Sequence, residues 1–335
     1  MRKRRNYIAN YAKEDSADER DIRNLFRQFV SVKVSEGVSE GTVHQYEENF
    51  GFFREYVEKH GNNFDVEFIT HEYIREWIMY MQYDHVQFRK VATRKVKDIG
   101  LKPATINTRI KTLRVMFNTL VREKLIENNP MSVIKNVYEP EQAIEVLSDK
   151  EIIRLFSVMD KSFYTVYRDY VLTMLLLDTM LRVTEATTLK SSDINREEGV
   201  LIIRASIAKS RKSRAVPVSD RVLRLLDELM KENAYQFHSD YIFATGQDSY
   251  YDRHTYSQRL KRYAEAAHIR KNIHPHLFRH TAATSWLENG GGMEELRLIL
   301  GHSKYEMVKR YAHVSSKTIV KAAKQYSITS KLNEI

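Results

Sequence analysis

Four short segments in the second half of the chain carry residue types that together can attack a phosphodiester without a metal ion. They are residues 181–185 (LRVTE), 207–214 (IAKSRKSR), 274–280 (HPHLFRH) and 300–311 (LGHSKYEMVKRY). Guanidinium groups stabilise the negative charge that gathers on phosphate oxygens in the transition state, and imidazole and ammonium groups transfer protons. A tyrosine hydroxyl, with an ordinary pKa of about 10, becomes a nucleophile when cations lower that pKa and a base lies within reach. Each segment alone is typical of structural residues, and only their joint occurrence in this order changes that interpretation.

The order of these segments resembles the tyrosine recombinase (phage integrase) family over most of the chain. Residues 179–185 (TMLRVTE) resemble the family's first arginine box, with Met180 where glycine is common. Residues 208–217 (AKSRKSRAVP) resemble its lysine-bearing β-hairpin without the glycines. Residues 276–279 (HLFR) resemble its His-x-x-Arg box, and residues 300–302 (LGH) resemble its Leu-Gly-His box.

This resemblance implies a set of six catalytic residues. They are Arg182, Lys209, His276, Arg279, His302 and Tyr311. Tyr311 follows nine residues after His302, as the nucleophile does in the family. Lys209 is the first choice for the lysine, and Lys212 is the alternative. Arg297 stands where many relatives carry glutamine, a departure that we expect to be peripheral.

The chemistry of each residue type agrees with a role at a phosphate. Arg182 and Arg279 would bind the non-bridging oxygens in a fixed, bidentate geometry. His302 would donate a further hydrogen bond, His276 would accept the tyrosine proton, and Lys209 would protonate the departing 5′ oxygen. The resulting 3′-phosphotyrosine retains the energy of the broken bond, so a second 5′ hydroxyl can reseal it without ATP. No Walker loop occurs in the sequence, and neither a cofactor nor a metal is expected.

Helices must position these residues, because helical periodicity dominates the chain. In the first part, apolar residues recur at steps of three and four, and helices are expected at residues 22–30, 40–60, 71–81 and 103–121. In the second part, Ser148 and Glu151 form a capping-box pattern that predicts the start of a helix. Strands are expected there at residues 200–203, 215–218 and 241–244, and a helix at residues 221–231. The fold class is therefore mainly α with a small antiparallel β-sheet.

The length of 335 residues favours two domains. The segment after the fourth expected helix is polar, contains Pro140 and lacks periodicity, as a linker does. The resemblance implies a SAM-like core-binding bundle followed by a mixed α+β catalytic domain. We expect a basic amino-terminal extension (1–19), a helical core-DNA-binding domain (20–137), a linker (138–146), a catalytic domain (147–316) and a carboxy-terminal tail suited to subunit contact (317–335).

The charge distribution favours a polyanionic partner. Lysine and arginine number 54 against 44 aspartates and glutamates, which gives a formal net charge of +10. Residues 89–114 hold nine of these cations with Asp98 as the single acid, and residues 204–214 form a second basic cluster. Amide and hydroxyl side chains among the cations suit contacts with DNA. The predicted DNA-binding residues are Arg89, Lys90, Arg94, Lys95, Lys102, Thr105, Asn107, Arg109, Lys111, Arg211, Lys212 and Arg214.

Three other functions compete with recombination. A type IB topoisomerase would share the tyrosine chemistry, although the amino-terminal helical domain and the tail favour a recombinase. A non-catalytic DNA-binding regulator would have lost at least one of the six residues, and none is lost. A metal-dependent nuclease would use the histidines at positions 274, 276, 280 and 302, but no carboxylate-rich cluster accompanies them and basic neighbours repel a divalent cation.

The biological setting is also an expectation. The chain has no cysteine and no apolar run long enough for a membrane span, which favours a soluble intracellular protein. The expected location is the cytoplasm of a prokaryote, in association with the nucleoid. The resemblance implies double-stranded recombination sites as substrate and a homo-tetramer on paired sites, with accessory DNA-bending or directionality factors as further partners. Integration, excision, resolution and inversion remain open, and we favour the recombinase of a mobile element.

Overall fold

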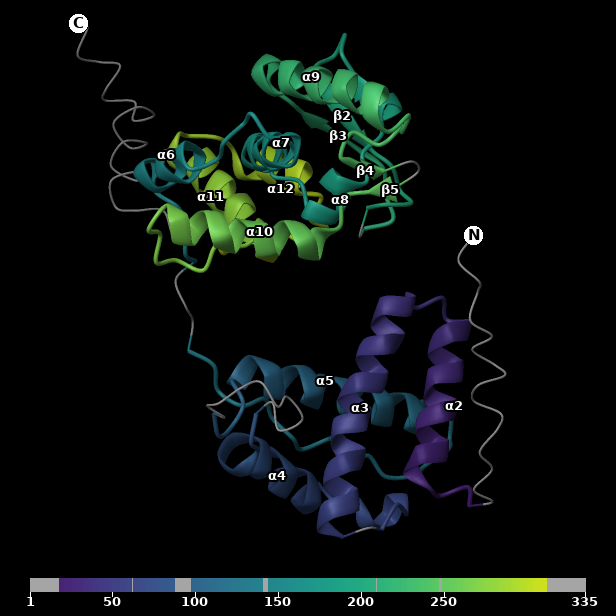
Figure 1. The fold of residues 1–335 in the computed structure, drawn as a ribbon. Coiled ribbons are helices and arrows are strands. Elements are labelled where there is room, and N and C mark those ends of the chain that lie inside the picture. The colour runs from purple at the N-terminus through teal and green to yellow at the C-terminus, as the bar shows by residue number, and fades with distance from the viewer. Residues whose placement is uncertain are drawn as a thin grey trace, which may run out of the picture. The chain divides into compact units, whose positions relative to one another are not determined.

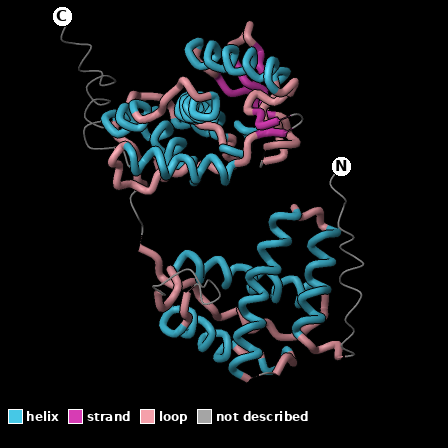
Figure 2. The backbone as a smooth tube through the Cα atoms, in the orientation of Figure 1, coloured by secondary structure: helices cyan, strands magenta, loops and turns pink. Residues whose placement is uncertain are grey.

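The computed structural model describes residues 18–61, 63–87, 98–140, 144–208, 210–246 and 249–311. The chain forms two compact units, which divide between residues 141 and 142 (Figure 1). Helices dominate both units, and the strands of the described residues all lie in the second unit (Figure 2). The predicted fold class, mainly helical with a small antiparallel sheet, is therefore confirmed.

The first unit is a helical bundle with short helical turns between its longer helices. Its elements are α2 (Ile22–Ser35), α3 (Glu40–His60), η1 (Val66–Phe68), α4 (His71–Met79), η2 (Tyr80–Asp84) and α5 (Pro103–Arg122). Local signals begin these helices: Asp21 accepts a hydrogen bond from the Arg23 amide, and Thr70 accepts one from the Tyr73 amide. The four expected helices are present, but the first continues to Ser35 and the third changes at Tyr80 into a π-helical turn.

Aromatic residues fill the core of the first unit. Phe53, Trp77 and Phe117 are fully buried. The rings of Phe26 and Phe50 stack with centroids 3.9 Å apart, which joins α2 to α3. This core does not depend on residues of the second unit, so the first unit has its own packing interior.

The second unit carries the remaining elements. Its helices are α6 (Asp149–Ser157), α7 (Tyr164–Thr179), α8 (Val183–Thr187), η3 (Ser191–Asp193), α9 (Asp220–Gln236), α10 (Arg253–Ala266), α11 (Pro275–Glu288), α12 (Met293–Leu300) and α13 (Glu306–Lys309). The predicted capping box forms at α6, where Ser148 and Glu151 satisfy each other's backbone amides. No helix among the described residues is both long and apolar enough to cross a membrane.

Two small antiparallel sheets accompany these helices. The first has the order β1 (Ile194–Asn195), β2 (Val200–Ile203) and β3 (Arg214–Pro217), and the second pairs β4 (Ala244–Gly246) with β5 (Ser249–Tyr250). The prediction for β2 is confirmed, whereas β3 begins and ends one residue earlier than expected. The strand expected at residues 241–244 is wrong for all but its last residue. Tyr241 makes only an isolated bridge with Lys190, and the Ile242 amide donates to the Leu189 carbonyl.

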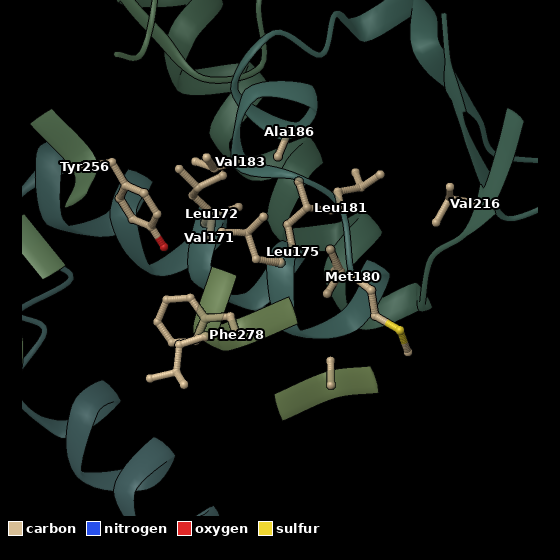
Figure 3. Packing of buried hydrophobic residues seen from close by; sticks show 14 of the residues in the cluster. Val171, Leu172, Leu175, Met180, Leu181, Val183, Ala186, Val216, Tyr256 and Phe278 are labelled. Carbon is tan, nitrogen blue, oxygen red and sulfur yellow. The ribbon is translucent and has the colours of Figure 1, made fainter. Parts of the chain in front are cut away.

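Helix α7 forms the centre of the second unit. Figure 3 shows its residues Val171, Leu172 and Leu175 among the buried side chains, together with Phe278 of α11 and Val183 of α8. Most residues of α7 are buried, which is typical of a helix in a domain interior. Because α7 packs against α11, the end of α7 lies close to the polar residues that α11 carries.

Candidate active site

The site begins at the turn that ends α7. Met180 adopts a left-handed conformation (φ 54°, ψ 23°), and its amide donates to the Leu176 carbonyl. This is the conformation for which glycine is the usual residue. The chain makes the turn with methionine, whose side chain is buried. The departure from the family's glycine at this position therefore leaves the turn in place.

Arg182 follows this turn and precedes α8. Its backbone amide donates to Glu185 Oε2 at 3.0 Å, and its Nη1 donates to Glu185 Oε1 at 2.9 Å. Glu185 is fully buried, and the Arg182 side chain is 16% exposed. One buried carboxylate therefore contacts both the backbone and the guanidinium of Arg182.

Arg279 joins three segments that are distant in the sequence. From α11, its Nη1 donates to the Met180 carbonyl at 2.6 Å, and its Nη2 donates to the Leu300 carbonyl at 2.8 Å. The same Nη2 lies 3.1 Å from His302 Nε2. Burial, followed by the charge of Arg182, lowers the pKa of Arg279 to about 10, so the group keeps its charge at neutral pH.

His302 is a buried, neutral hydrogen-bond donor. The Arg279 guanidinium can only donate, so His302 Nε2 accepts and its proton lies on Nδ1. Among the described residues, this Nδ1 has no hydrogen-bond partner. Burial, with the nearby charge of Arg279, lowers the pKa of His302 to about 4. A buried donor of this kind is suited to a phosphate oxygen supplied by a ligand.

The hydroxyl of Tyr311 lies against His280, a histidine outside the six predicted catalytic residues. Tyr311 is 5% exposed, and its Oη lies 2.9 Å from Nδ1 of His280. Burial raises the pKa of Tyr311, although the cations Arg279 and Arg310 act in the opposite direction. Burial also lowers the pKa of His280 to about 4. At neutral pH the tyrosine is therefore protonated and hydrogen bonded to a neutral imidazole.

Helix geometry explains why His280 belongs to the site. His276, Arg279 and His280 lie three and four residues apart on α11 and so share one helix face. His276, the sequence-based choice for proton acceptor, is exposed in the first turn of this helix. The signal for His280 was its place directly after Arg279, but only the fold brings it to Tyr311.

Two residues are candidates for the catalytic lysine, Lys209 and its alternative Lys212. Lys209 lies outside the described residues, and Lys212 is exposed on the segment between β2 and β3. Of the six predicted catalytic residues, the structure brings together Arg182, Arg279, His302 and Tyr311.

The predicted DNA-binding residues divide into three groups. Lys102, Thr105, Lys111, Arg211 and Lys212 are exposed. The predictions at positions 89, 90, 94 and 95 lie outside the described residues.

The third group is engaged within the chain. The Asn107 side chain exchanges two hydrogen bonds with the backbone of Val137, at 2.8 and 2.9 Å. The Arg109 guanidinium lies 3.3 Å from the ring centroid of Phe52, and burial lowers its pKa to about 10. Arg214 contacts Glu185 with two nitrogens. These three side chains already have partners inside the unit to which each belongs.

The histidines contact other polar groups in this structure. His274 Nδ1 lies 2.8 Å from the Asn272 carbonyl oxygen, while His280 and His302 contact Tyr311 and Arg279. Within the described part of the chain, no three histidine, cysteine, aspartate or glutamate side chains form a group that could hold a metal ion.

Two arginines, a buried histidine donor and a buried tyrosine, in a helical unit that follows a helical bundle, define the class of enzymes that cut and rejoin DNA through tyrosine. The chain belongs to the phage integrase family, that is, to the tyrosine recombinases. The model of the phage integrase family matches residues 145–318, and the model of the phage integrase SAM-like domain matches residues 21–137. The expectation of a tyrosine recombinase is confirmed.

Known proteins similar to this chain carry the same description. Tyrosine recombinase XerD of Staphylococcus epidermidis is 26% identical, over 88% of this chain and 95% of the relative. Tyrosine recombinase XerD of Listeria innocua is also 26% identical, over 91% of this chain and 98% of the relative. The chain is thus a tyrosine site-specific recombinase that acts on DNA and carries out strand exchange.

Solved structures confirm the fold. XerH site-specific recombinase bound to palindromic difH substrate matches with a TM-score of 0.70 and 19% identity, over 96% of this chain and 89% of that protein. A lambda integrase dimer bound to a COC′ core site matches with a TM-score of 0.67 and 17% identity, over 89% of this chain and 97% of that protein.

Proposed function

We propose that Tyr311 is the nucleophile of this recombinase and that Arg182, Arg279 and His302 bind the phosphate it attacks. The observation that carries the proposal is the position of Arg279. Its guanidinium holds the turn before Arg182 and contacts His302, and its charge acts on the pKa of Tyr311. Two cations and a buried N–H donor in one place suit the negative charge of a five-coordinate phosphorus.

In this proposal, His280 accepts the proton as Tyr311 attacks. The bond from Oη to phosphorus forms, the Oη proton passes to His280 Nδ1, and the bond from phosphorus to the 5′ oxygen breaks. The departing 5′ oxygen takes a proton from Lys209, with Lys212 as the alternative donor. The contact of 2.9 Å between His280 and Tyr311 supports His280 as first acceptor. His276, one helical turn earlier, is the second candidate.

The test is a suicide substrate with a nick beside the cleavage site, which traps the covalent protein–DNA adduct. Tyr311→Phe removes only the hydroxyl, so we expect no adduct and an unchanged affinity for DNA. Tyr305→Phe removes the hydroxyl of a nearby, more exposed tyrosine and serves as the matched control, with adduct at the wild-type yield. Normal adduct formation by Tyr311→Phe would show that another residue is the nucleophile.

DNA contacts are proposed for the exposed members of the predicted set, Lys102, Thr105, Lys111, Arg211 and Lys212. Their exposure supports this proposal, because a DNA phosphate in solution can reach exposed side chains. Asn107, Arg109 and Arg214 are omitted, since their side chains already have partners inside the chain.

We further propose that the enzyme works as a homo-tetramer on two DNA sites, in the cytoplasm of a prokaryote. Recombination of two duplexes requires four strand cuts, and each cut uses one tyrosine. The dimer of lambda integrase on a core site and the bacterial XerD relatives support this arrangement. A tail at residues 317–335, outside the described residues, is proposed to join neighbouring subunits. Sizing of the complex of Tyr311→Phe with paired sites tests the tetramer.

The biological task proposed is integration and excision, or resolution, for a mobile element. A Tn1549 transposon integrase in complex with transposon right-end DNA shares the fold, with a TM-score of 0.68 and 19% identity over 90% of this chain and 99% of that protein. Accessory DNA-bending or directionality factors belong to the same proposal.

A further inference from the structure

Arg214 lies inside the second unit although its sequence neighbours are exposed. It is the first residue of β3 and pairs with Ile203 at the end of the β2–β3 ladder where the connecting segment joins the two strands. The residues before it, Arg211 and Lys212, are exposed, whereas the Arg214 side chain is only 10% exposed. A cation in this position does not belong to the exposed basic surface of the hairpin.

The guanidinium of Arg214 makes a two-pronged contact with Glu185. Nη2 donates to Oε2 at 2.7 Å, and Nη1 donates to Oε1 at 3.2 Å. Arg182 uses the same two oxygens, through its Nη1 and its backbone amide. Each oxygen of this buried carboxylate therefore accepts two hydrogen bonds, and the place of Arg182 depends on a carboxylate that Arg214 holds from the other side.

A third contact connects Arg214 to the segment that carries His302. Its Nε donates to the carbonyl oxygen of Ile299 at 3.2 Å, near the end of α12. A Cβ atom added at Gly301 would lie 3.0 to 3.1 Å from atoms of the Arg214 side chain. Arg214 thus packs directly against the left-handed turn that precedes His302.

We propose that Arg214 is a positioning residue for DNA cleavage, which holds Arg182 through Glu185 and holds the turn before His302 through Ile299. This inference rests on the phosphate-binding roles proposed above for Arg182 and His302. It replaces the sequence-based prediction that Arg214 contacts DNA. It also links the β2–β3 hairpin, whose exposed cations are proposed to meet DNA, to the orientation of the phosphate-binding groups.

The test compares Arg214→Ala and Arg214→Lys with the wild-type full-length chain. Lysine keeps the charge but lacks the two-pronged geometry. We expect covalent adduct formation from the suicide substrate to fall about 100-fold with alanine and about 10-fold with lysine, at saturating DNA. The dissociation constant for intact sites and its salt dependence should stay unchanged. A DNA-contacting arginine would instead lower the slope of log affinity against log salt by about one unit, and that result would overturn the proposal.

The variant Arg204→Ala distinguishes a positioning role of Arg214 from a purely structural role. Arg204 lies directly after β2 and contacts the buried Asp193 at 2.9 Å, so its loss also removes an arginine–carboxylate pair, next to the same sheet. Thermal unfolding curves of the variants identify an assay temperature at which every variant is folded. At that temperature, equal losses of adduct formation in Arg204→Ala and Arg214→Ala would overturn the proposal. If Arg214→Ala does not fold, Arg214→Lys carries the same comparison.

A double variant and a pH profile test the route through Glu185. If Arg214 acts through this carboxylate, Glu185→Gln combined with Arg214→Ala should cleave no more slowly than the slower single variant. Arg182, Arg214 and Arg279 are the charged groups that act on Glu185, and Arg214 contributes most to lowering its pKa. Cleavage by Arg214→Ala should therefore be lost at a higher pH than wild-type cleavage when the solution is acidified, and the double variant should not show this loss.

Purely additive effects with an unchanged pH profile would overturn the route through Glu185. Failure of the wild-type chain to form any adduct would instead overturn the proposed function itself. The two failures are therefore distinguishable in one set of measurements.

Discussion

The two arginines proposed to bind phosphate differ in how much structure they also support. Arg279 is 3% exposed and donates to the carbonyl groups of Met180 and Leu300, so its guanidinium closes the junction of α7, α11 and α12. Arg182 contacts the Glu185 carboxylate, and its side chain is more exposed than that of Arg279. Removal of the planar guanidinium should therefore affect chemistry at both positions but stability mainly at Arg279.

Arg182→Lys and Arg279→Lys test this difference. Both should reduce cleavage by at least 100-fold at saturating DNA, because an ammonium group cannot bind two oxygens in the same geometry. Arg279→Lys should also lower the free energy of unfolding by about 1–3 kcal/mol, since it leaves a buried carbonyl group without a donor. Urea denaturation and adduct formation measure the two effects. A collapse of DNA affinity equal to the loss of cleavage would identify these residues as ground-state binding groups.

The histidines of the site give the protein a predictable response to acid. Burial lowers the pKa of His302 and of His280 from an ordinary value of 6.5 to about 4. Between these values the unfolded chain binds protons that the folded chain does not, so the folded state loses stability as the pH falls. The contribution of both histidines is complete above pH 6.5 and decreases from there toward pH 4.

We expect the free energy of unfolding to fall between pH 6.5 and pH 4 by up to about 1.4 kcal/mol per pH unit for His302. The effect of His280 should be smaller, because solvent reaches part of its ring. Urea denaturation at pH 7, 6 and 5 measures the slope. His302→Asn should flatten it, whereas His254→Gln, a change at an exposed histidine, should not. The same slope in His302→Asn as in wild type would contradict a buried, neutral His302.

At the scale of helices and strands, several residues of the site lie where helices end. Left-handed residues end two of the helices: Met180 ends α7, and Gly301 ends α12. Each turn places a carbonyl or an imidazole against Arg279. These turns differ in their surroundings, because the side chain of Met180 is accommodated in the core while the space at Gly301 is occupied by Arg214.

Gly301→Ala tests the second turn, with Gly199→Ala as a matched control. The φ angles of the two glycines are +64° and +63°, so both substitutions carry the same backbone strain of about 1–2 kcal/mol. A Cβ atom at Gly199 meets nothing nearer than 3.9 Å, whereas one at Gly301 would lie 3.0 to 3.1 Å from Arg214, which would have to shift slightly. Gly301→Ala should therefore be the less stable by about 1–3 kcal/mol and cleave at least 10-fold more slowly. Equal stability and equal cleavage in the two variants would show that Arg214 yields without cost.

Local sequence signals predicted most helices and strands well. Where the prediction was wrong, contacts between distant segments decide the conformation. The capping box at Ser148 and the proline that begins α5 act within one helical turn, so the sequence alone places them. Residues 241–243 have strand composition, but a bridge and a hydrogen bond to the segment around Lys190 decide their conformation. The extent of a short strand depends on its partner, which composition does not reveal.

The sequence likewise predicted only part of the candidate site. The family resemblance predicted Arg182, Arg279, His302 and Tyr311 as site residues, but it did not reveal the acceptor of the tyrosine hydrogen bond. His280 and Tyr311 are 31 residues apart in the chain, and Arg214 and Glu185 are 29 apart. Composition alone made Arg214 a DNA-binding cation. Its burial against a carboxylate follows from the fold of the second unit.

At the scale of the whole molecule, the positive charge of the first unit has two different uses. Lys102 and Lys111 are exposed at the start of α5 and along it, where they can meet a polyanion. Arg109 lies on the same helix, but its guanidinium covers the ring of Phe52 and contacts the sulfur of Met81. A cation placed in this way contributes packing and a cation–π interaction within the first unit.

Salt titration of DNA binding separates the two uses. Each phosphate contact releases condensed counterions, so loss of one contact lowers the slope of log affinity against log salt by about 0.9. Lys102→Ala combined with Lys111→Ala should lower the slope by about two units and leave the free energy of unfolding within about 0.5 kcal/mol of wild type. Arg109→Ala should leave the slope unchanged and lower the free energy of unfolding by about 1–2 kcal/mol, because the ring of Phe52 loses its cover. An unchanged slope in the double variant would show that neither lysine contacts a DNA phosphate and that both are solvated surface groups. A lower slope in Arg109→Ala would mean that this arginine leaves Phe52 when DNA binds, and the first unit would then rearrange on its target.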